Sequence, residues 1–245
     1  MSPKKIFFGN GLPYVDTSDL SGKLIVIEGT DGVGRTSQIE LLKNWLEVRG
    51  YGVMTTGWTQ SPLMEKVIDD AKKGHGLNVN TFSLLYAADF ADRLEHQIIP
   101  ALKSGFIVLA DRYIYTAFAR GIVRGADRTW VHSIYGFALE PDGIFYMKIS
   151  PEDLIPRVIN SQRLRYRYWD EEAGEGMDYW ESGMDLGLGE DFYDSFVEYQ
   201  VRVLREFDLM AEDFRFQVID ASKKFEEINR ILQEGILAIL EPHVT

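Results

Sequence analysis

The sequence predicts an α/β fold, a doubly wound parallel sheet with helices on both of its faces. Short and nearly continuous apolar runs alternate along the chain with segments whose apolar residues recur at helical spacing. Continuous apolar runs are typical of strands that are buried on both faces of a parallel sheet. A glycine-rich turn joins the first apolar run to the first helical segment, as at the ligand-binding edge of such sheets.

Each expected strand is a short apolar run that is followed by a helical segment. The runs are residues 24–28, 52–56, 105–110, 144–149 and 216–220. The expected helices carry apolar residues on one face, namely Ile39, Leu42, Trp45 and Leu46; Tyr86, Phe90, Leu94 and Ile98; Phe196, Tyr199, Val203, Phe207 and Met210; and Ile228, Ile231, Leu232 and Ile236. We expect Gly50 and Gly52 to end the first helix and Pro100 to end the second.

Composition limits the classes of partner. Turn formers fill residues 1–22, which we expect to be an N-terminal extension of a single domain over residues 23–245. The net charge of −12 argues against a nucleic-acid polymer as a partner. Cysteine is absent, which excludes disulfides and cysteine nucleophiles and suits a reducing compartment. Because no apolar run approaches the roughly 20 residues that span a bilayer, we expect no membrane partner and a cytoplasmic protein.

The glycine-rich turn has the layout of a phosphate-binding P-loop. Residues 29–36 read Gly-Thr-Asp-Gly-Val-Gly-Arg-Thr, and Arg35 stands where the pattern has lysine. Glycines let successive backbone N–H groups point into one concavity, and the helix that follows adds its dipole. A neighbouring cation neutralises the β- and γ-phosphates, and a hydroxyl such as that of Thr36 can hold Mg²⁺. A chance glycine-rich turn is the alternative, but the strand before it and the helix after it favour nucleotide phosphate.

A second candidate segment follows the predicted strand 105–110. Asp111 and Arg112 come at its carboxyl end, where an open α/β sheet binds ligands, so both should face the same crevice as the P-loop. Asp111 is placed to reach Mg²⁺ through water, and Arg112 is placed to grip a second phosphate. A surface turn with a local ion pair is the alternative, and the P-loop makes the functional interpretation the better one.

Residues 157–201 change abruptly in charge. Arg157, Arg163, Arg165 and Arg167 lie close together and would repel one another unless an anion is present. The acidic and glycine-containing stretch 170–194 follows, and from Tyr168 to Val201 there is no lysine or arginine. A solvated loop between two helices is the plain interpretation of the acidic half.

Together these segments resemble the thymidylate kinase family. The resemblance is carried by 29–36, by 84–89 (Leu-Leu-Tyr-Ala-Ala-Asp), by 111–113 (Asp-Arg-Tyr) and by 141–146 (Pro-Asp-Gly-Ile-Phe-Tyr), in the family's order and spacing. It covers about residues 24 to 235. It implies a five-stranded parallel sheet of the P-loop kinase type, a helical lid around 160–192 that carries arginines, and usually a homodimer. It also implies transfer of the γ-phosphoryl group of ATP to dTMP, which gives dTDP.

The resemblance also implies a role for each matching residue. The phosphates of ATP would lie on Gly29, Thr30, Asp31, Gly32, Val33, Gly34, Arg35 and Thr36, with Mg²⁺ at Thr36 and Asp111. The acceptor would contact Asp31, Tyr86, Phe90, Arg112, Thr116 and Arg120. In the family Asp31 matches the acid at the acceptor sugar, Arg112 the arginine on the acceptor phosphate, and Tyr86 the aromatic that stacks on the base. The catalytic set would be Asp31, Arg35 and Arg112 with the lid residues Arg163, Arg165 and Arg167.

This chain departs from the family pattern at several of these positions. Arg35 keeps the charge of the P-loop lysine but replaces a compact ammonium with a planar fork. Thr56 stands where an arginine usually holds the acceptor phosphate, Phe90 where an arginine usually contacts the thymine, and Arg120 where a tyrosine usually checks the sugar. Loss of hydrogen-bonding partners around the base relaxes discrimination between acceptors. Arg120 is a candidate to replace the missing phosphate contact.

The sequence therefore predicts a kinase that uses ATP and Mg²⁺ and acts on a nucleoside monophosphate, with dTMP as the leading acceptor. Two alternatives follow from the departures. One is a nucleotide-binding protein of this fold with weak or no activity on dTMP, because the P-loop cation and two acceptor positions are altered. The other is a kinase for another phosphorylated small molecule, with Trp58 and Phe90 lining an apolar acceptor pocket.

Overall fold

A computed structural model describes residues 4–74, 77–160, 183–190 and 192–241 of the chain. These residues form a five-stranded parallel sheet with the strand order β2-β3-β1-β4-β5. The strands are β1 (Lys23–Glu28), β2 (Val53–Gly57), β3 (Ile107–Asp111), β4 (Gly143–Lys148) and β5 (Gln217–Asp220). Every predicted strand is confirmed, with bounds that move by one or two residues at an end.

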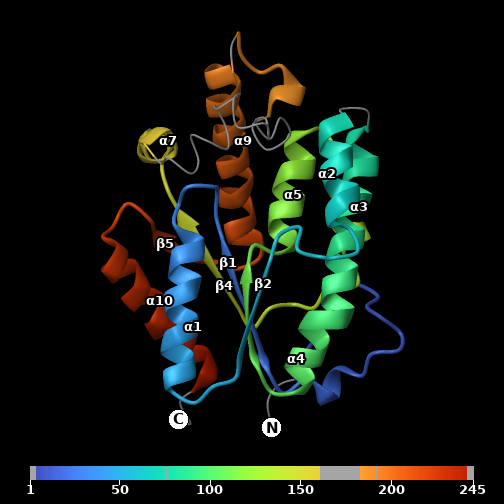
Figure 1. Ribbon diagram of the computed structural model, residues 1–245, viewed down its shortest axis with the longest axis vertical. Helices are drawn as coiled ribbons and strands as arrows, with labels where there is room; N and C mark the ends of the chain where they lie inside the picture. Colours follow the sequence, from blue (N-terminus) through green and yellow to red (C-terminus); the bar gives the residue numbers. More distant parts are fainter. Residues whose placement is uncertain (1–3, 75–76, 161–182, 191, 242–245) are drawn as a thin grey trace.

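Helices cover both faces of this sheet (Figure 1). They are α1 (Arg35–Val48), α2 (Glu65–Gly74), α3 (Val79–Arg93), α4 (Ile99–Lys103), α5 (Ile114–Val123), α6 (Arg128–Ile134), α7 (Pro151–Asn160), α9 (Phe192–Asp213) and α10 (Phe225–Leu240), with short 3-10 helices η1 (Thr17–Asp19) and η4 (Met184–Leu186). None of the helices in the described part of the chain combines the length and the apolar character needed to cross a membrane.

The sheet separates two apolar cores because successive side chains of a strand point to opposite faces. On β1, Leu24 and Val26 pack with residues of α3, α5 and α9, whereas Ile25 and Ile27 pack with residues of α1 and α10. All four side chains are fully buried, which explains the continuous apolar run in the sequence. The doubly wound α/β prediction is confirmed.

The predicted end of the second helix at Pro100 is wrong. A π-helical turn, η2 (Leu94–Ile98), joins α3 directly to α4, and the three pieces lie end to end (Figure 1). Pro100 stands in the first turn of α4, where a helix tolerates a residue without a backbone N–H. The carbonyl of Pro100 still accepts a hydrogen bond from the Ser104 N–H at 3.1 Å. The π turn shifts the hydrogen-bond register of the backbone, and the helix continues past Pro100 as α4.

The segment before β1 packs on the domain. Lys5 is buried and pairs with Asp142, which also accepts the Leu24 N–H at 2.7 Å. Phe7 forms an antiparallel bridge with Leu139, and the Phe8 ring lies 5.4 Å from the ring of Phe214. These contacts seal the edge of the core that involves α5, α6 and the end of α9.

Candidate active site

The glycine-rich loop between β1 and α1 has the backbone that phosphate binding requires. Gly29 and Gly34 have φ values of 147° and 97°, which a residue with a Cβ rarely adopts. A Cβ on Gly29 would also lie 3.0 Å from the carbonyl oxygen of Met147. Val33 is buried in the core and anchors the loop. Gly34 caps α1 without a side chain, so the first amides of this helix are available to an anion.

Arg35 is the first residue of α1, and its guanidinium folds back into the loop. Its Nε donates to Asp111 Oδ1 at 2.7 Å, and its Nη1 donates to the carbonyl oxygens of Gly29, at 2.5 Å, and Thr30. Its Nη2 lies 3.9 Å from Asp31. Burial opposes the charge, but Asp111 and Asp31 outweigh it, so the pKa of Arg35 is raised. An ammonium could not make these planar, divergent contacts at once.

Asp111 joins the end of β3 to the start of α1. One carboxylate oxygen accepts from Arg35, and the other accepts from the Thr36 hydroxyl at 2.9 Å. Burial disfavours the charge of Asp111, but Arg35 and Arg112 outweigh burial and hold the pKa of its carboxyl below the ordinary value. Thr36 and Asp111, the residues predicted to hold a metal ion, therefore lie in direct contact and present oxygen donors at the mouth of the loop.

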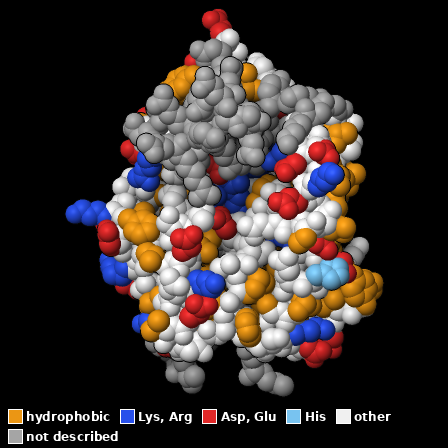
Figure 2. All heavy atoms as spheres, viewed as in Figure 1, with side chains coloured by type: hydrophobic (Ala, Val, Ile, Leu, Met, Phe, Trp, Pro, Cys, Tyr) orange, Lys and Arg blue, Asp and Glu red, His pale blue; other side chains and the backbone are white. Residues whose placement is uncertain are grey.

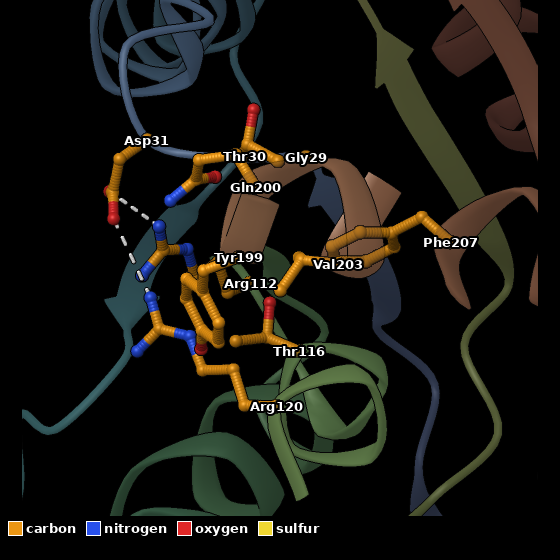
Figure 3. Close-up of a pocket in the computed structure, with 10 residues that line it drawn as sticks. All are labelled: Gly29, Thr30, Asp31, Arg112, Thr116, Arg120, Tyr199, Gln200, Val203 and Phe207. Carbon is orange, nitrogen blue, oxygen red and sulfur yellow. Dashed lines mark hydrogen bonds and ion pairs between the residues drawn. The ribbon is translucent and has the colours of Figure 1, made fainter. Parts of the chain in front are cut away.

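A cavity open to solvent, with about 260 Å³ of empty space that includes its mouth, lies between the loop, α5 and α9 (Figure 3). Its lining comprises Gly29, Thr30, Asp31, Arg112, Thr116, Arg120, Tyr199, Gln200, Val203 and Phe207. The guanidiniums of Arg112 and Arg120 both point to the carboxylate of Asp31, and the Arg120 contact measures 3.5 Å (Figure 3). In the space-filling view, Lys and Arg atoms show in a hollow near the middle of this face (Figure 2). We call the cavity lined by these ten residues the phosphate cavity.

A second cavity open to solvent, with about 300 Å³ of empty space that includes its mouth, lies between α3 and α5, and we call it the aromatic cavity. Its lining comprises Val79, Phe82, Ser83, Tyr86, Ala117, Arg120, Gly121, Arg124 and Tyr135. Tyr86 is supported by the ring of Trp58 at 4.7 Å and by that of Phe82 at 5.0 Å. The Arg120 guanidinium lies 5.7 Å from the centre of the Trp58 ring. Arg120 lines both cavities and so marks where they meet.

Phe90 is not among the residues that line the two cavities. It is 1% exposed, and in the core its ring packs 4.9 Å from that of Tyr113 and 5.8 Å from that of Tyr135, which lines the aromatic cavity. Phe90 follows Tyr86 by one helical turn on α3, and burial of its apolar ring in the core stabilises the fold. The base-contacting position expected from the family pattern is thus a core position in this chain.

Thr56, the other altered position, belongs to a buried polar network. Its hydroxyl accepts from Arg93 Nη1 at 3.2 Å, and Arg93 Nε donates to Asp89 at 2.9 Å. Asp89 also accepts the Ser61 N–H at 2.9 Å. Arg93 and Asp89 are each 2% exposed at the side chain. The network ties the turn after β2 to α3 and so supports the segment that carries Trp58.

The structure adds residues of α9 to the site and leaves others undescribed. Tyr199 and Gln200 line the phosphate cavity although no chemical motif marks them in the sequence. The helical spacing of Tyr199 and Val203 indicated a buried face of this helix but not which space it closes. The predicted lid residues Arg163, Arg165 and Arg167 lie outside the described residues.

Comparison with known proteins identifies the family of this chain. The family described as Thymidylate kinase matches residues 27–174. A probable thymidylate kinase 2 of Saccharolobus solfataricus is 40% identical over 89% of this chain and 98% of its own length. A thymidylate kinase of Shouchella clausii is 31% identical over 86% of this chain and 96% of its own, and a probable thymidylate kinase of Thermococcus gammatolerans is 29% identical over 85% and 93%. This chain belongs to the thymidylate kinase family, whose members use ATP to phosphorylate dTMP to dTDP.

Proposed function

We propose that this thymidylate kinase transfers the γ-phosphoryl group with Arg35 in the role of the P-loop lysine. The observation that carries the proposal is the Arg35 guanidinium inside the glycine-rich loop, held by Asp111 at 2.7 Å and by two loop carbonyls. When ATP binds, its β- and γ-phosphate oxygens are better partners for Nη1 than neutral carbonyls are. The Nη1 of Arg35 would then donate to phosphate oxygens instead of to the carbonyls of Gly29 and Thr30, while its Nε would keep the hydrogen bond to Asp111.

We propose Thr36 and Asp111 as the residues at the Mg²⁺ ion. Mg²⁺ prefers oxygen ligands and usually takes only one or two from the protein, the rest coming from water and phosphate. Thr36 and Asp111 fit this pattern because they present a hydroxyl and a carboxylate. Among the described residues, no group of three or more histidine or acidic side chains is arranged to hold a metal ion. When bound, Mg²⁺ supplies neutralisation of the charge on the transferring phosphates.

We propose that dTMP binds across the two cavities. Its phosphate would lie in the phosphate cavity on Arg112 and Arg120, its sugar near Asp31, and its base in the aromatic cavity beside Tyr86. Arg120 lines both cavities, so it is placed to supply the phosphate contact that Thr56 lacks. Thr116 lines the phosphate cavity from α5 as Arg120 does, and Phe90 would stabilise the core without contacting dTMP.

Catalysis would consist mainly of positioning and of charge neutralisation, because phosphoryl transfer needs little covalent chemistry from the protein. The guanidiniums of Arg35 and Arg112 would hold the donor and acceptor phosphates on either side of the transferring group. Arg163, Arg165 and Arg167 are proposed to close over that group and to exclude water, which would otherwise hydrolyse ATP. Because of the family to which the chain belongs, we also propose that it forms a homodimer and lies in the cytoplasm. Light scattering would test the dimer, and cell fractionation would test the location.

The experiment is a coupled assay of ADP production with Mg–ATP and six acceptors: dTMP, dUMP, UMP, CMP, AMP and GMP. We expect the highest kcat/KM for dTMP. Arg112→Met should raise the KM for dTMP by about 100-fold, since it removes a charged contact to phosphate. Arg230→Met removes an exposed arginine of α10 and should leave the KM for dTMP unchanged. Turnover with another acceptor but not with dTMP would overturn the acceptor assignment, and binding of ATP without any turnover would favour a nucleotide-binding protein.

A further inference from the structure

Glu28 is a buried acid that the proposed reaction leaves without a role. It ends β1, directly before the first glycine of the loop, and it is fully buried. Its carboxylate lies at the start of α5, where it accepts three hydrogen bonds: from the Tyr113 N–H at 2.8 Å, the Thr116 N–H at 3.3 Å and the Thr116 hydroxyl at 2.8 Å. The strand that leads into the P-loop is thus bonded to the helix that carries the acceptor-side residues.

These bonds make Glu28 the cap of α5, although it belongs to another element. The N-cap residue of α5 is Tyr113, whose side chain makes no capping bond and instead donates its hydroxyl to the Leu139 carbonyl at 2.9 Å. The first amides of a helix have no partner within the helix, and their partial positive charge favours an anion. A carboxylate from β1 meets both needs of α5.

The same bonds fix the backbone of Arg112. This residue has a φ of 71°, a left-handed conformation that is unfavourable for a residue with a Cβ. The amides on either side of it are both held by β1: the Arg112 N–H donates to the Ile27 carbonyl at 3.1 Å, and the Tyr113 N–H donates to Glu28. The turn directs the Arg112 guanidinium toward Asp31 in the phosphate cavity (Figure 3).

We propose that Glu28 is a positioning residue for the transfer, which holds Arg112 and Thr116 in register with the P-loop without touching either nucleotide. The proposal rests on the acceptor roles given above to these two residues. Arg120 lies one helical turn beyond Thr116 on α5, so the same cap also sets its place along the cavity. One carboxylate therefore links the donor side of the site to the acceptor side.

The ionisation of Glu28 gives the proposal a signature. Burial raises the pKa of its carboxyl to about 7, against the opposing effects of the hydrogen bonds from Thr116 and Tyr113 and of the charges of Arg35 and Arg112. Among the described residues, the hydroxyls of Tyr115 and Tyr146 also feel the charge of Glu28. Their pKa values are raised, mainly by burial and further by this charge, so they stay neutral. Protonation of Glu28 removes the negative charge that caps α5.

Acceptor affinity and fold stability should respond to this proton in opposite directions. Because the folded-state pKa lies above the ordinary value of 4.5, the folded protein binds the proton more tightly than the unfolded chain does. Glu28 therefore makes the fold more stable as the pH falls from about 7 toward 4.5. Affinity for dTMP should fall over the same window, so loss of binding there is not loss of fold.

The experiment measures steady-state constants from about pH 5.5 to pH 8.5 for the wild type and for Glu28→Gln, which keeps the shape but not the charge. At about pH 8 we expect the variant to raise the KM for dTMP about 10-fold and to leave the KM for Mg–ATP within about twofold. The wild type should lose kcat/KM for dTMP below about pH 7, and the variant should lack this limb. A limb near pH 6 from the substrate phosphate should remain in both.

Asn229→Ala is the matched control, because Asn229 is a buried polar residue that bonds Gln38 between α10 and α1. It should lower the melting temperature without changing the KM for dTMP. Should Glu28→Gln not fold, Thr116→Val replaces it: loss of the hydroxyl bond should move the acid limb to higher pH, whereas loss of a direct dTMP contact alone raises KM equally at every pH. A Glu28→Gln enzyme with the wild-type KM and the wild-type limb overturns the proposal. Failure of the wild type on dTMP would instead overturn the proposed function.

Discussion

Arg35 and Asp111 form a partly buried ion pair, 2.7 Å between Nε and Oδ1, that joins the P-loop helix to the end of β3. The second oxygen of Asp111 accepts the Thr36 hydroxyl, so the loop cation and the two metal-binding candidates form one network. The guanidinium is an integral part of this network because its planar fork reaches Asp111 and two loop carbonyls together. Four predictions follow from this arrangement, from the buried network of Arg93 and from the aromatic cavity.

Arg35→Ala should reduce kcat/KM for Mg–ATP by about 100- to 1,000-fold at saturating dTMP, since it removes the charge that faces the transferring phosphates. Arg35→Lys should stay within about 10-fold of the wild type, because it keeps the charge but gives up the fork. Thermal unfolding of both variants serves as the control for folding. An Arg35→Ala enzyme with the wild-type constant would show that the guanidinium has no part in the transfer.

Asp111→Asn should raise the Mg²⁺ concentration needed for half-maximal rate by about 10-fold or more, because a neutral amide oxygen is a poorer ligand for a hard cation. The wild-type carboxylate is ionised at neutral pH, since Arg35 and Arg112 overcome its burial and lower its pKa. Titration of the rate with MgCl₂ at fixed ATP measures the effect. Glu234→Gln removes an exposed acid of α10 and should leave the titration unchanged; an unchanged titration of Asp111→Asn would remove Asp111 from the metal site.

Arg93→Met should lower the free energy of unfolding by about 3–5 kcal/mol, because it leaves the Asp89 charge buried without its arginine. The double variant Asp89→Asn with Arg93→Met should lose less than the sum of the single losses. Thr56→Val, which removes one weaker partner of Arg93, should cost only about 1 kcal/mol. Urea unfolding of the wild type, the single variants Asp89→Asn and Arg93→Met, and the double variant closes the cycle, and additive losses would mean that the pair does not act as a unit.

Tyr86→Ala should raise the KM for dTMP by about 10- to 100-fold, because it removes the ring beside which the base is proposed to lie. Tyr86→Phe should keep the wild-type KM, since the ring and not the hydroxyl makes this contact. Phe90→Leu is the matched aromatic control: it should lower the melting temperature and leave the KM unchanged, because Phe90 is a core residue. If Phe90→Leu changed the KM as Tyr86→Ala does, the two aromatics would have the same role.

The strands and the P-loop could be predicted because their signals are local. A buried parallel strand needs a continuous apolar run, and the turn after β1 needs glycines at Gly29 and Gly34, where φ is positive. Asp111 and Arg112 were predicted from their place at the end of an apolar strand. The contact of Asp111 with Thr36 then follows from the neighbouring positions of β1 and β3 in the sheet.

Other features depend on contacts between distant segments, which a single sequence does not display. Glu28 is the last residue of an apolar strand in the sequence, and only the packing of α5 against β1 makes it a cap. Gln200 faces the phosphate cavity because of where α9 lies, and its neighbours in sequence carry no sign of this. The family pattern predicts that Phe90 contacts the acceptor, but the direction of a side chain is set by helix rotation and core packing.

The most direct test of the account follows the wild-type protein with Mg–ATP and dTMP by ³¹P NMR. The account predicts that ADP and dTDP appear together in about equal amounts, because the acceptor and not water takes the γ-phosphoryl group. Formation of ADP without dTDP, or no change in either nucleotide, would contradict it.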